Sequence, residues 1–177
     1  MPERFDMKAG RALALLVAVV AALAIAWPTA AWADVVVEGT GETGTWSWSL
    51  DADGTLTIGG TGIESDLASR EAPWHDNAST ITAVSFKDGS TTGDCLVRLF
   101  GDCTNLESIA WNGLDTSAAT NMESMFYGCI NLEAVDLSGF TTSNVTDMGG
   151  MFWGCSGLKS VIFGEHFDTH NVTNMGL

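Results

Sequence analysis

The chain has 177 residues, of which 46% are hydrophobic and 20 are glycine, a composition typical of a folded, turn-rich protein rather than a disordered acidic tail. It carries 7 Lys and Arg against 22 Asp and Glu, and the resulting net charge of −15 disfavours binding to nucleic acid or to an anionic membrane surface. Its 4 cysteines are too few for a small fold built on disulfides, so packed side chains must stabilise it.

Residues 1–33 have the features of a secretory signal peptide. A basic segment over 4–11 precedes an apolar run over 12–27, and Ala31-Trp32-Ala33 supplies small residues for cleavage. A retained membrane anchor is the alternative, but a spanning helix needs about 20 apolar residues and this run is shorter. We therefore expect a mature chain that begins at Asp34, and a secreted or cell-surface protein with no membrane insertion after cleavage.

Residues 34–80 predict a small amino-terminal β cap. Apolar and polar residues alternate over 46–50 and again over 55–58, and Asp51-Ala52-Asp53-Gly54 joins the two runs, so we expect a β-hairpin. The Asp51-x-Asp53-Gly54 spacing also resembles the start of a calcium loop. Because Gly62 stands at the twelfth position, where a bidentate Glu should close such a site, we favour a plain hairpin turn.

The remainder of the chain, residues 81–177, contains a repeat with a period of 26 residues. Three sets of residues share this spacing: Phe100/Phe126/Phe152, Cys103/Cys129/Cys155 and Leu106/Leu132/Leu158. Each unit also has an L-x-x-V-x-L pattern, which predicts a strand with one buried face. We expect about four stacked units in a parallel sheet, with rungs at Ile81/Val84/Phe86, Leu106/Ile109/Trp111, Leu132/Val135/Leu137 and Leu158/Val161/Phe163.

Between the strands, residues 120–127 and 146–153 are each predicted to form a short helix. Thr120 and Glu123 fit a capping box, and an apolar stripe follows at helical spacing, made of Met122, Met125 and Phe126. We interpret this stripe as core filling rather than as a cofactor or redox site. The predicted fold class is therefore an α/β repeat solenoid, leucine-rich-repeat-like, with a parallel sheet, short helices and a small amino-terminal β cap.

The repeat cysteines are predicted to be buried free thiols. Cys103, Cys129 and Cys155 occupy one position of the repeat, so stacked side chains would point the same way rather than toward one another. A disulfide between Cys95 and Cys103 is the alternative in an exported protein.

A possible metal site lies near the carboxyl end. His166 and His170, with Glu165 and Asp168 nearby, have a spacing that could bind a metal on a helix. Ser143 aligns with His170 one unit earlier, however, and this favours an exposed repeat loop.

Three asparagines lie in N-x-[ST] glycosylation sequences, at Asn77, Asn144 and Asn171. Within the repeat, Asn144 and Asn171 are expected instead to bond turn backbone. No pattern of nucleophile, base and acid suits catalysis, so we predict no enzymatic activity, no cofactor and no metal, and the sequence leaves the binding residues unknown.

Several segments of the chain form a specific pattern: Met-Phe-Tyr-Gly-Cys (125–129), Met-Phe-Trp-Gly-Cys (151–155), the segments 135–148 and 167–175, and an entry region that contains Trp48, Asp53-Gly54-Thr55-Leu56-Thr57-Ile58, Gly60-Thr61-Gly62 and Pro73-Trp74. In these segments the chain resembles the BspA-like leucine-rich-repeat surface proteins of bacteria and some parasitic protists. The resemblance implies a right-handed solenoid displayed on a cell surface and generally associated with adhesion to host proteins or other cells.

The predicted function is that of an adhesin or protein-binding module, with host extracellular-matrix or cell-surface proteins, or neighbouring cells, as partners. The alternative is a structural stalk that presents another domain, and an accessory module of a secreted hydrolase is a weaker third possibility. Earlier units continue into Met-Phe-x-Gly-Cys where this chain has 174–177, which leaves the last rung uncovered. We therefore expect a fragment of a longer product, or else a chain that frays from Ser156 onward or self-associates. A tail over 168–177 that folds back as a cap is the alternative.

Overall fold

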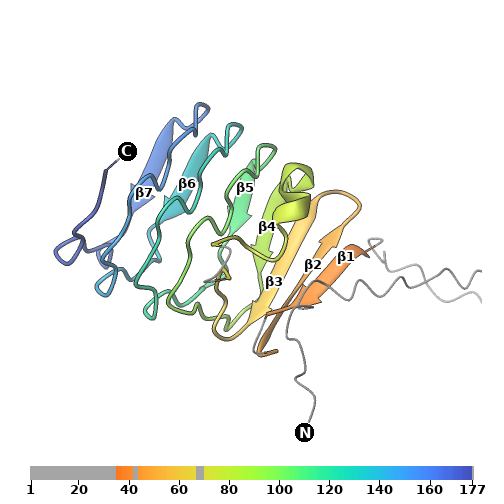
Figure 1. Cartoon of the computed structure of the whole chain (residues 1–177), viewed down its shortest axis with the longest axis horizontal. Helices are drawn as coiled ribbons and strands as arrows, with labels where there is room; N and C mark the ends of the chain where they lie inside the picture. The colour runs from red at the N-terminus through yellow and green to blue at the C-terminus, as the bar shows by residue number, and fades with distance from the viewer. Residues whose placement is uncertain (1–34, 42–43, 67–69, 177) are drawn as a thin grey trace, which may run out of the picture. The chain divides into compact units, whose positions relative to one another are not determined.

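The computed structural model describes residues 35–41, 44–66 and 70–176, which fall within one compact unit (Figure 1). The predicted signal peptide and its cleavage site near Ala33 lie outside the described residues. Those predictions are therefore not tested by the structure.

The amino-terminal part of the described chain is an antiparallel meander of three strands, β1 (Val35–Thr40), β2 (Trp46–Asp51) and β3 (Thr55–Gly60). Alternate residues of β2 and β3 are buried, as the alternation of apolar and polar residues predicts. The hairpin predicted between 46–50 and 55–58 is confirmed, with Trp48 opposite Ile58. Strand β1 was not predicted.

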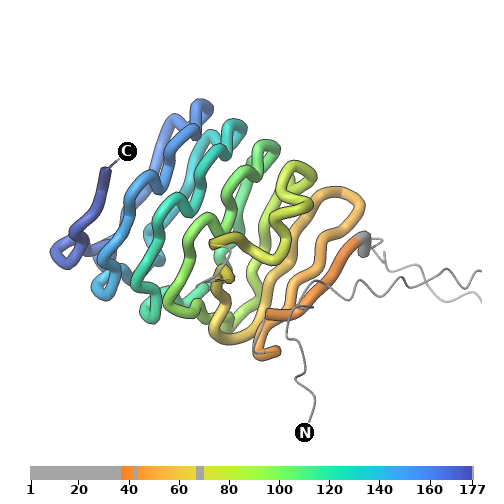
Figure 2. The backbone as a smooth tube through the Cα atoms, in the orientation of Figure 1, coloured from red at the N-terminus to blue at the C-terminus, as the bar shows by residue number. Residues whose placement is uncertain are grey.

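The later strands pair in parallel, one unit to the next. Strand β4 (Ala83–Phe86) pairs with β3 and β5 (Ser108–Ala110) in a five-stranded mixed sheet, while β6 (Ala134–Leu137) and β7 (Ser160–Phe163) form a second, two-stranded sheet. Residues at one repeat position are direct neighbours, such as Val84 with Ile109 and Val135 with Val161. Figure 2 shows the backbone returning to the same edge once in every unit.

The predicted α/β solenoid with a parallel sheet and short helices is wrong. The described residues form strands and turns in mixed sheets, and η1 (His75–Thr80), a single 3-10 helix, is the one helical element among them. Residues 120–127 and 146–153 consist of turns and isolated bridges rather than helices.

Hydrogen bonding between units explains why those helices do not form. The N–H groups of Met122, Ser124 and Phe126 donate to carbonyls of the following unit, each at 2.9 Å, instead of to a carbonyl four residues earlier. Ser124 has a φ of 55° and Gly128 a φ of 71°, both in the left-handed region that an α-helix cannot use.

The predicted capping box is also absent. The Thr120 hydroxyl donates to the Asp94 carbonyl oxygen at 3.2 Å, and the Glu123 carboxylate pairs with Arg70 rather than with the backbone of Thr120. Both side chains therefore stabilise contacts between distant parts of the chain instead of a helix terminus.

The core is a continuous apolar column with an aromatic ladder at its centre. Phe126 stacks on Phe100 at 5.7 Å and on Phe152 at 5.4 Å between ring centroids, and Trp74, one repeat earlier, stacks on Phe100 at 6.3 Å. Met122 and Met125 are fully buried beside this ladder, which confirms the core-filling interpretation of the Met and Phe stripe.

Cover over the core declines in the last unit. Leu137 in β6 is fully buried, whereas Phe163, its paired residue in β7, is 53% exposed. Beyond β7 the chain does not fold back over this rung. The tail continues the register of the repeat, since Asn174 forms a parallel bridge with Asp147 and the Thr173 N–H donates to the Thr146 carbonyl at 2.8 Å.

Candidate functional site

The Asp51-x-Asp53-Gly54 sequence forms a hairpin turn. The Asp51 carboxylate accepts the backbone N–H groups of Asp53 at 3.0 Å and of Thr55 at 2.8 Å, and Gly54 has a φ of 84°. This carboxylate oxygen is therefore used to hold the turn, as expected for an Asp at the start of a tight turn.

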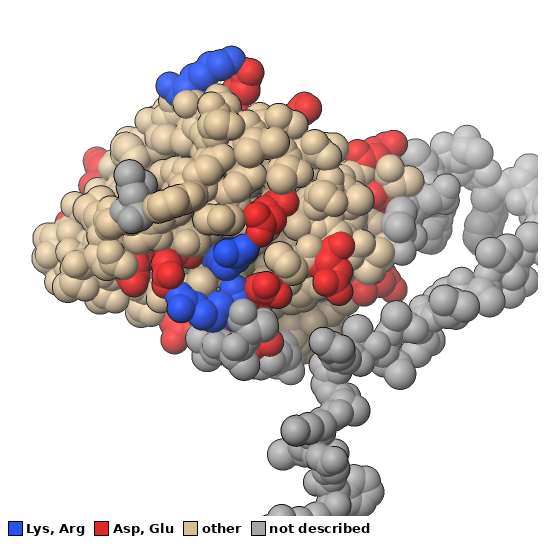
Figure 3. All heavy atoms as spheres, turned by 45° about the horizontal axis from the view of Figure 1, so that its top comes forward, with Lys and Arg blue, Asp and Glu red and all other residues tan. Residues whose placement is uncertain are grey.

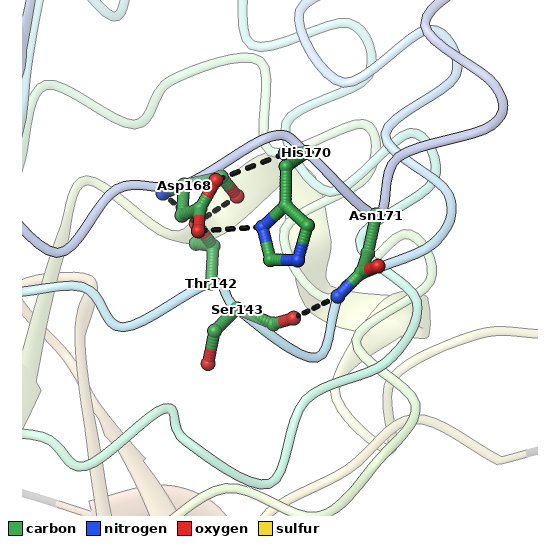
Figure 4. A network of polar contacts seen from close by, with 5 residues as sticks. All are labelled: Thr142, Ser143, Asp168, His170 and Asn171. Atoms are coloured by element: carbon green, nitrogen blue, oxygen red, sulfur yellow. Dashed lines mark hydrogen bonds and ion pairs between the residues drawn. The ribbon is translucent and has the colours of Figure 1, made fainter.

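The His166 and His170 side chains bind separate partners in an exposed loop. His170 Nδ1 lies 2.6 Å from Asp168 Oδ2 (Figure 4), and His166 Nε2 lies 3.4 Å from Glu165 Oε1. Within 35–41, 44–66 and 70–176, no three side chains of His, Cys, Asp or Glu come together as a metal site would require.

The repeat asparagines connect adjacent units. Asn144 Nδ2 donates to the Ser117 carbonyl at 2.8 Å, and Asn171 Nδ2 donates to the Ser143 carbonyl at 2.8 Å, the second bond being drawn in Figure 4. They bond turn backbone, as predicted, but the turn belongs to the preceding unit.

The four cysteines are free thiols, so Cys95 and Cys103 do not form a disulfide in this structure. Cys103 and Cys129 are buried, as predicted, but Cys155 is only partly buried, so the prediction of burial is wrong for the last unit. Burial raises the pKa of the Cys103 thiol to about 12 and raises the pKa of Cys129 as well. The Cys129 thiol donates to the Phe100 carbonyl at 3.1 Å, so its role in the fold is structural.

Two aspartate side chains stabilise turns between the strands. The backbone N–H of Ser117 lowers the pKa of Asp115, and that of His170 lowers the pKa of Asp168, because each carboxylate accepts an N–H two residues ahead. On the face shown in Figure 3, the Lys and Arg atoms lie beside Asp and Glu atoms, with uncharged surface between these groups.

One hollow of about 280 Å³ opens on the turn side of the repeat units. We call it the Tyr127–Trp153 hollow. Its walls are two aromatic rings, three polar side chains and three glycines: Tyr127, Trp153, Glu123, Ser124, Asn174, Gly149, Gly150 and Gly176. Trp153 is 50% exposed, although large aromatic side chains are generally well buried.

Two glycines line the hollow where the preceding unit has larger residues. Gly149 and Gly150 stand where that unit has Glu123 and Ser124. Gly150 has a φ of 59° and Ser124 a φ of 55°, so this position keeps the same left-handed backbone. The Asn174 amide takes the space beside Gly149, where a Cβ would lie 2.5 Å from Asn174 Nδ2, whereas a Cβ at Gly150 would lie 3.3 Å from Ser124 Oγ and 3.7 Å from Trp153 Cβ, so the absent side chain at Gly150 leaves space beside Trp153.

Charged groups at the edge of the hollow are already paired. Glu123 pairs with Arg70, and Arg98 pairs with Asp102 at 2.5 Å while its guanidinium lies 4.7 Å from the centre of the Tyr127 ring. The hollow thus combines aromatic surface with neutralised charge. It can hold a ligand by ring contact and hydrogen bonds.

Sequence reasoning did not identify this hollow. Two changes between units are visible in the sequence. One repeat position holds Gly101, then Tyr127, then Trp153, and a nearby pair of positions changes from Glu123-Ser124 to Gly149-Gly150. The pattern shows which residues differ between units, but the fold is needed to show that they share one side and that Asn174 closes the hollow.

Comparisons with known proteins find similarity to one family over part of the chain and to one solved structure. Residues 94–177 match a family described as "Mycoplasma protein of unknown function, DUF285", a segment that contains every residue of the hollow. No curated protein matches the chain. A crystal structure of a leucine-rich repeat protein from Eubacterium ventriosum is similar, with 19% identity and a TM-score of 0.34 over 69% of this chain and 42% of that one. The present chain therefore spans less than half the length of that protein.

A search of the described residues for a membrane-spanning helix finds none that is sufficiently long and apolar.

Proposed function

We propose that this protein is an exported, cell-surface repeat module that binds another macromolecule through the face that carries Trp153. The observation that carries the proposal is the half-exposed indole of Trp153 beside an open hollow. Tryptophan is one of the residues that contribute most binding energy in protein contacts, because it buries a large area at low entropic cost.

The scaffold around Trp153 supports a binding role. Adjacent units are joined by backbone bonds such as Gly128 N–H to the Trp153 carbonyl at 2.8 Å, so the exposed ring sits on an ordered backbone. On the strand side the first outward column consists of small residues, since the register aligns Ala83 with Ser108 and Ala134 with Ser160. The exposed large side chains of that side, Ile162 and Phe163, lie together on β7 in the last unit. The resemblance of 125–129 and 151–155 to adhesive surface repeats points in the same direction.

Export and adhesion are tested together. The protein should be found outside the producing cell with Asp34 as its first residue by mass spectrometry. It should bind saturably to host cells, or to one member of a panel of extracellular-matrix and surface proteins, and Trp153→Ala should weaken that binding at least tenfold.

The matched control is Ile130→Ala, since Ile130 is 45% exposed and does not line the hollow. Equal binding by the Trp153→Ala and Ile130→Ala variants would show that the contact lies elsewhere on the surface. An absence of saturable binding to every panel member would favour the stalk instead.

A further inference from the structure

The chemistry of the Tyr127–Trp153 hollow points to one class of ligand. We infer that the hollow binds a neutral sugar residue of a surface glycan. This inference rests on the proposed binding function and specifies what the face recognises.

Aromatic surface supplies the first requirement of such a site. Tyr127 and Trp153 occupy the same position in successive units and both line the hollow. The C–H face of a pyranose ring is flat and apolar, so it can pack on an aromatic ring while the hydroxyl groups at its rim stay available for hydrogen bonds.

Hydrogen-bond donors and acceptors supply the second requirement. Asn174 Nδ2 donates to Asp147 Oδ1 at 3.0 Å, and Asn174 Oδ1 accepts the Gly176 N–H at 3.1 Å, so the amide is held in one orientation. These two bonds use one of its two N–H hydrogens and one of its two oxygen lone pairs. The Ser124 hydroxyl beside it can donate or accept. Sugar hydroxyls both donate and accept, which suits this mixture.

The charge balance selects against ionic ligands. The chain carries a net charge of −15, which repels sialylated or sulfated glycans. A cationic side chain would need a free carboxylate, but Glu123, the carboxylate that lines the hollow, pairs with Arg70. A neutral, hydroxyl-rich ligand is not repelled by the net charge and does not need a free carboxylate.

The size of the hollow fits a single sugar unit of a longer chain. Its volume of about 280 Å³ is just below the range of about 300–1,000 Å³ typical of sites for drug-sized molecules. Because it is open to solvent, the rest of a glycan could extend away from it. We expect single sugars to bind weakly, with Kd on the order of 1 mM, and oligosaccharides more tightly.

Two variants test the hollow without removing its scaffold. Trp153→Phe keeps an aromatic face and should retain most binding of neutral oligosaccharides on a glycan array. Gly150→Ser should abolish it, because a serine hydroxyl would project into the hollow. The fold already accepts serine at this φ in Ser124, and a Cβ at Gly150 would lie 3.3 Å from Ser124 Oγ. Both variants should melt within a few degrees of the unmodified protein.

The outcomes separate this inference from the proposed function. Binding to glycoproteins that is lost after enzymatic removal of neutral glycans, and lost in Gly150→Ser, supports the inference. Binding that depends on Trp153 but survives deglycosylation overturns the sugar inference, while the proposed binding function stands. Equal binding of sialylated and neutral glycans overturns the inferred preference for a neutral ligand. No binding to native or deglycosylated surfaces overturns both.

Discussion

The rings of Phe126 and Phe152, which are 26 residues apart, stack with an interplanar angle of 1° and a centroid separation of 5.4 Å. This contact repeats the one between Phe100 and Phe126, so each unit uses the ring of its neighbour as the wall of its own core. The stability of one unit should therefore depend on the next.

Truncation of the central ring tests this dependence. Phe126 is fully buried between its two neighbours, so Phe126→Ala should lower the free energy of unfolding by about 3–5 kcal/mol. Phe163→Ala is the matched control, because Phe163 is half exposed, and it should cost about 1 kcal/mol or less. Urea denaturation measures both, and equal losses would argue against the aromatic ladder as the main stabilising element.

Glycine positions test the close approach of neighbouring units. A Cβ at Gly164 would lie 1.9 Å from the Ser138 carbonyl oxygen, whereas a Cβ at Gly139 meets no atom within 4 Å. Gly164→Ala should therefore destabilise the protein by about 1–3 kcal/mol, since the clash is with backbone. Gly139→Ala should be nearly neutral. Thermal melts that rank the two variants in the opposite order would contradict the packing of β6 against β7.

Thiol labelling tests the burial of the cysteines. Cys155 is half-buried, whereas Cys103 and Cys129 lie inside the core, so a small maleimide should label Cys155 first in the native protein. Cys103 and Cys129 should react only when the protein unfolds. Peptide mass spectrometry after timed labelling identifies the site. Rapid native labelling of Cys129 would show that the core is open at its centre.

Alkaline pH should weaken the fold. Burial raises the pKa of Cys103 to about 12, while a thiol in the unfolded chain ionises near about 8.5. The thiol's contribution to stability is therefore complete below about pH 8.5 and declines as pH rises toward the folded pKa, by about 1 kcal/mol per pH unit. Urea denaturation at pH 7.5 and at pH 10 should show a smaller loss for Cys103→Ala than for the unmodified protein. An identical loss in both would contradict this assignment.

The strands could be predicted because alternation of apolar residues has one simple cause. In Val135 and Leu137, and in Val84 and Phe86, two-residue periodicity reflects one buried face, and the structure places strands there. The helix prediction failed because helical spacing of apolar residues has more than one structural cause. Met122, Met125 and Phe126 have helical spacing, but a turn whose N–H groups donate to the next unit buries the same three side chains. Local spacing does not distinguish these two arrangements.

The candidate site depends on residues that are distant in the chain. Asn174 follows Trp153 by 21 residues, and it reaches the hollow because its unit continues the backbone register of Asp147. Periodicity aligns Asn174 with Asp147, yet neither pattern nor composition indicates that the glycines at 149 and 150 line a cavity. The half-exposed state of Cys155 is similar, because its sequence position equals that of the buried Cys129.

The most direct test of the central claim is NMR mapping of the binding face on the ¹⁵N-labelled protein, with the Trp153 indole N–H assigned by comparison with Trp153→Phe. On addition of a neutral oligosaccharide selected by glycan array, the shifts should change at the Trp153 indole and at the amides of Gly150 and Asn174. Amides of the strand face, such as Ser108 and Ala134, should not move. Shift changes confined to the strand face, or none at Trp153 at saturating ligand, would contradict the account.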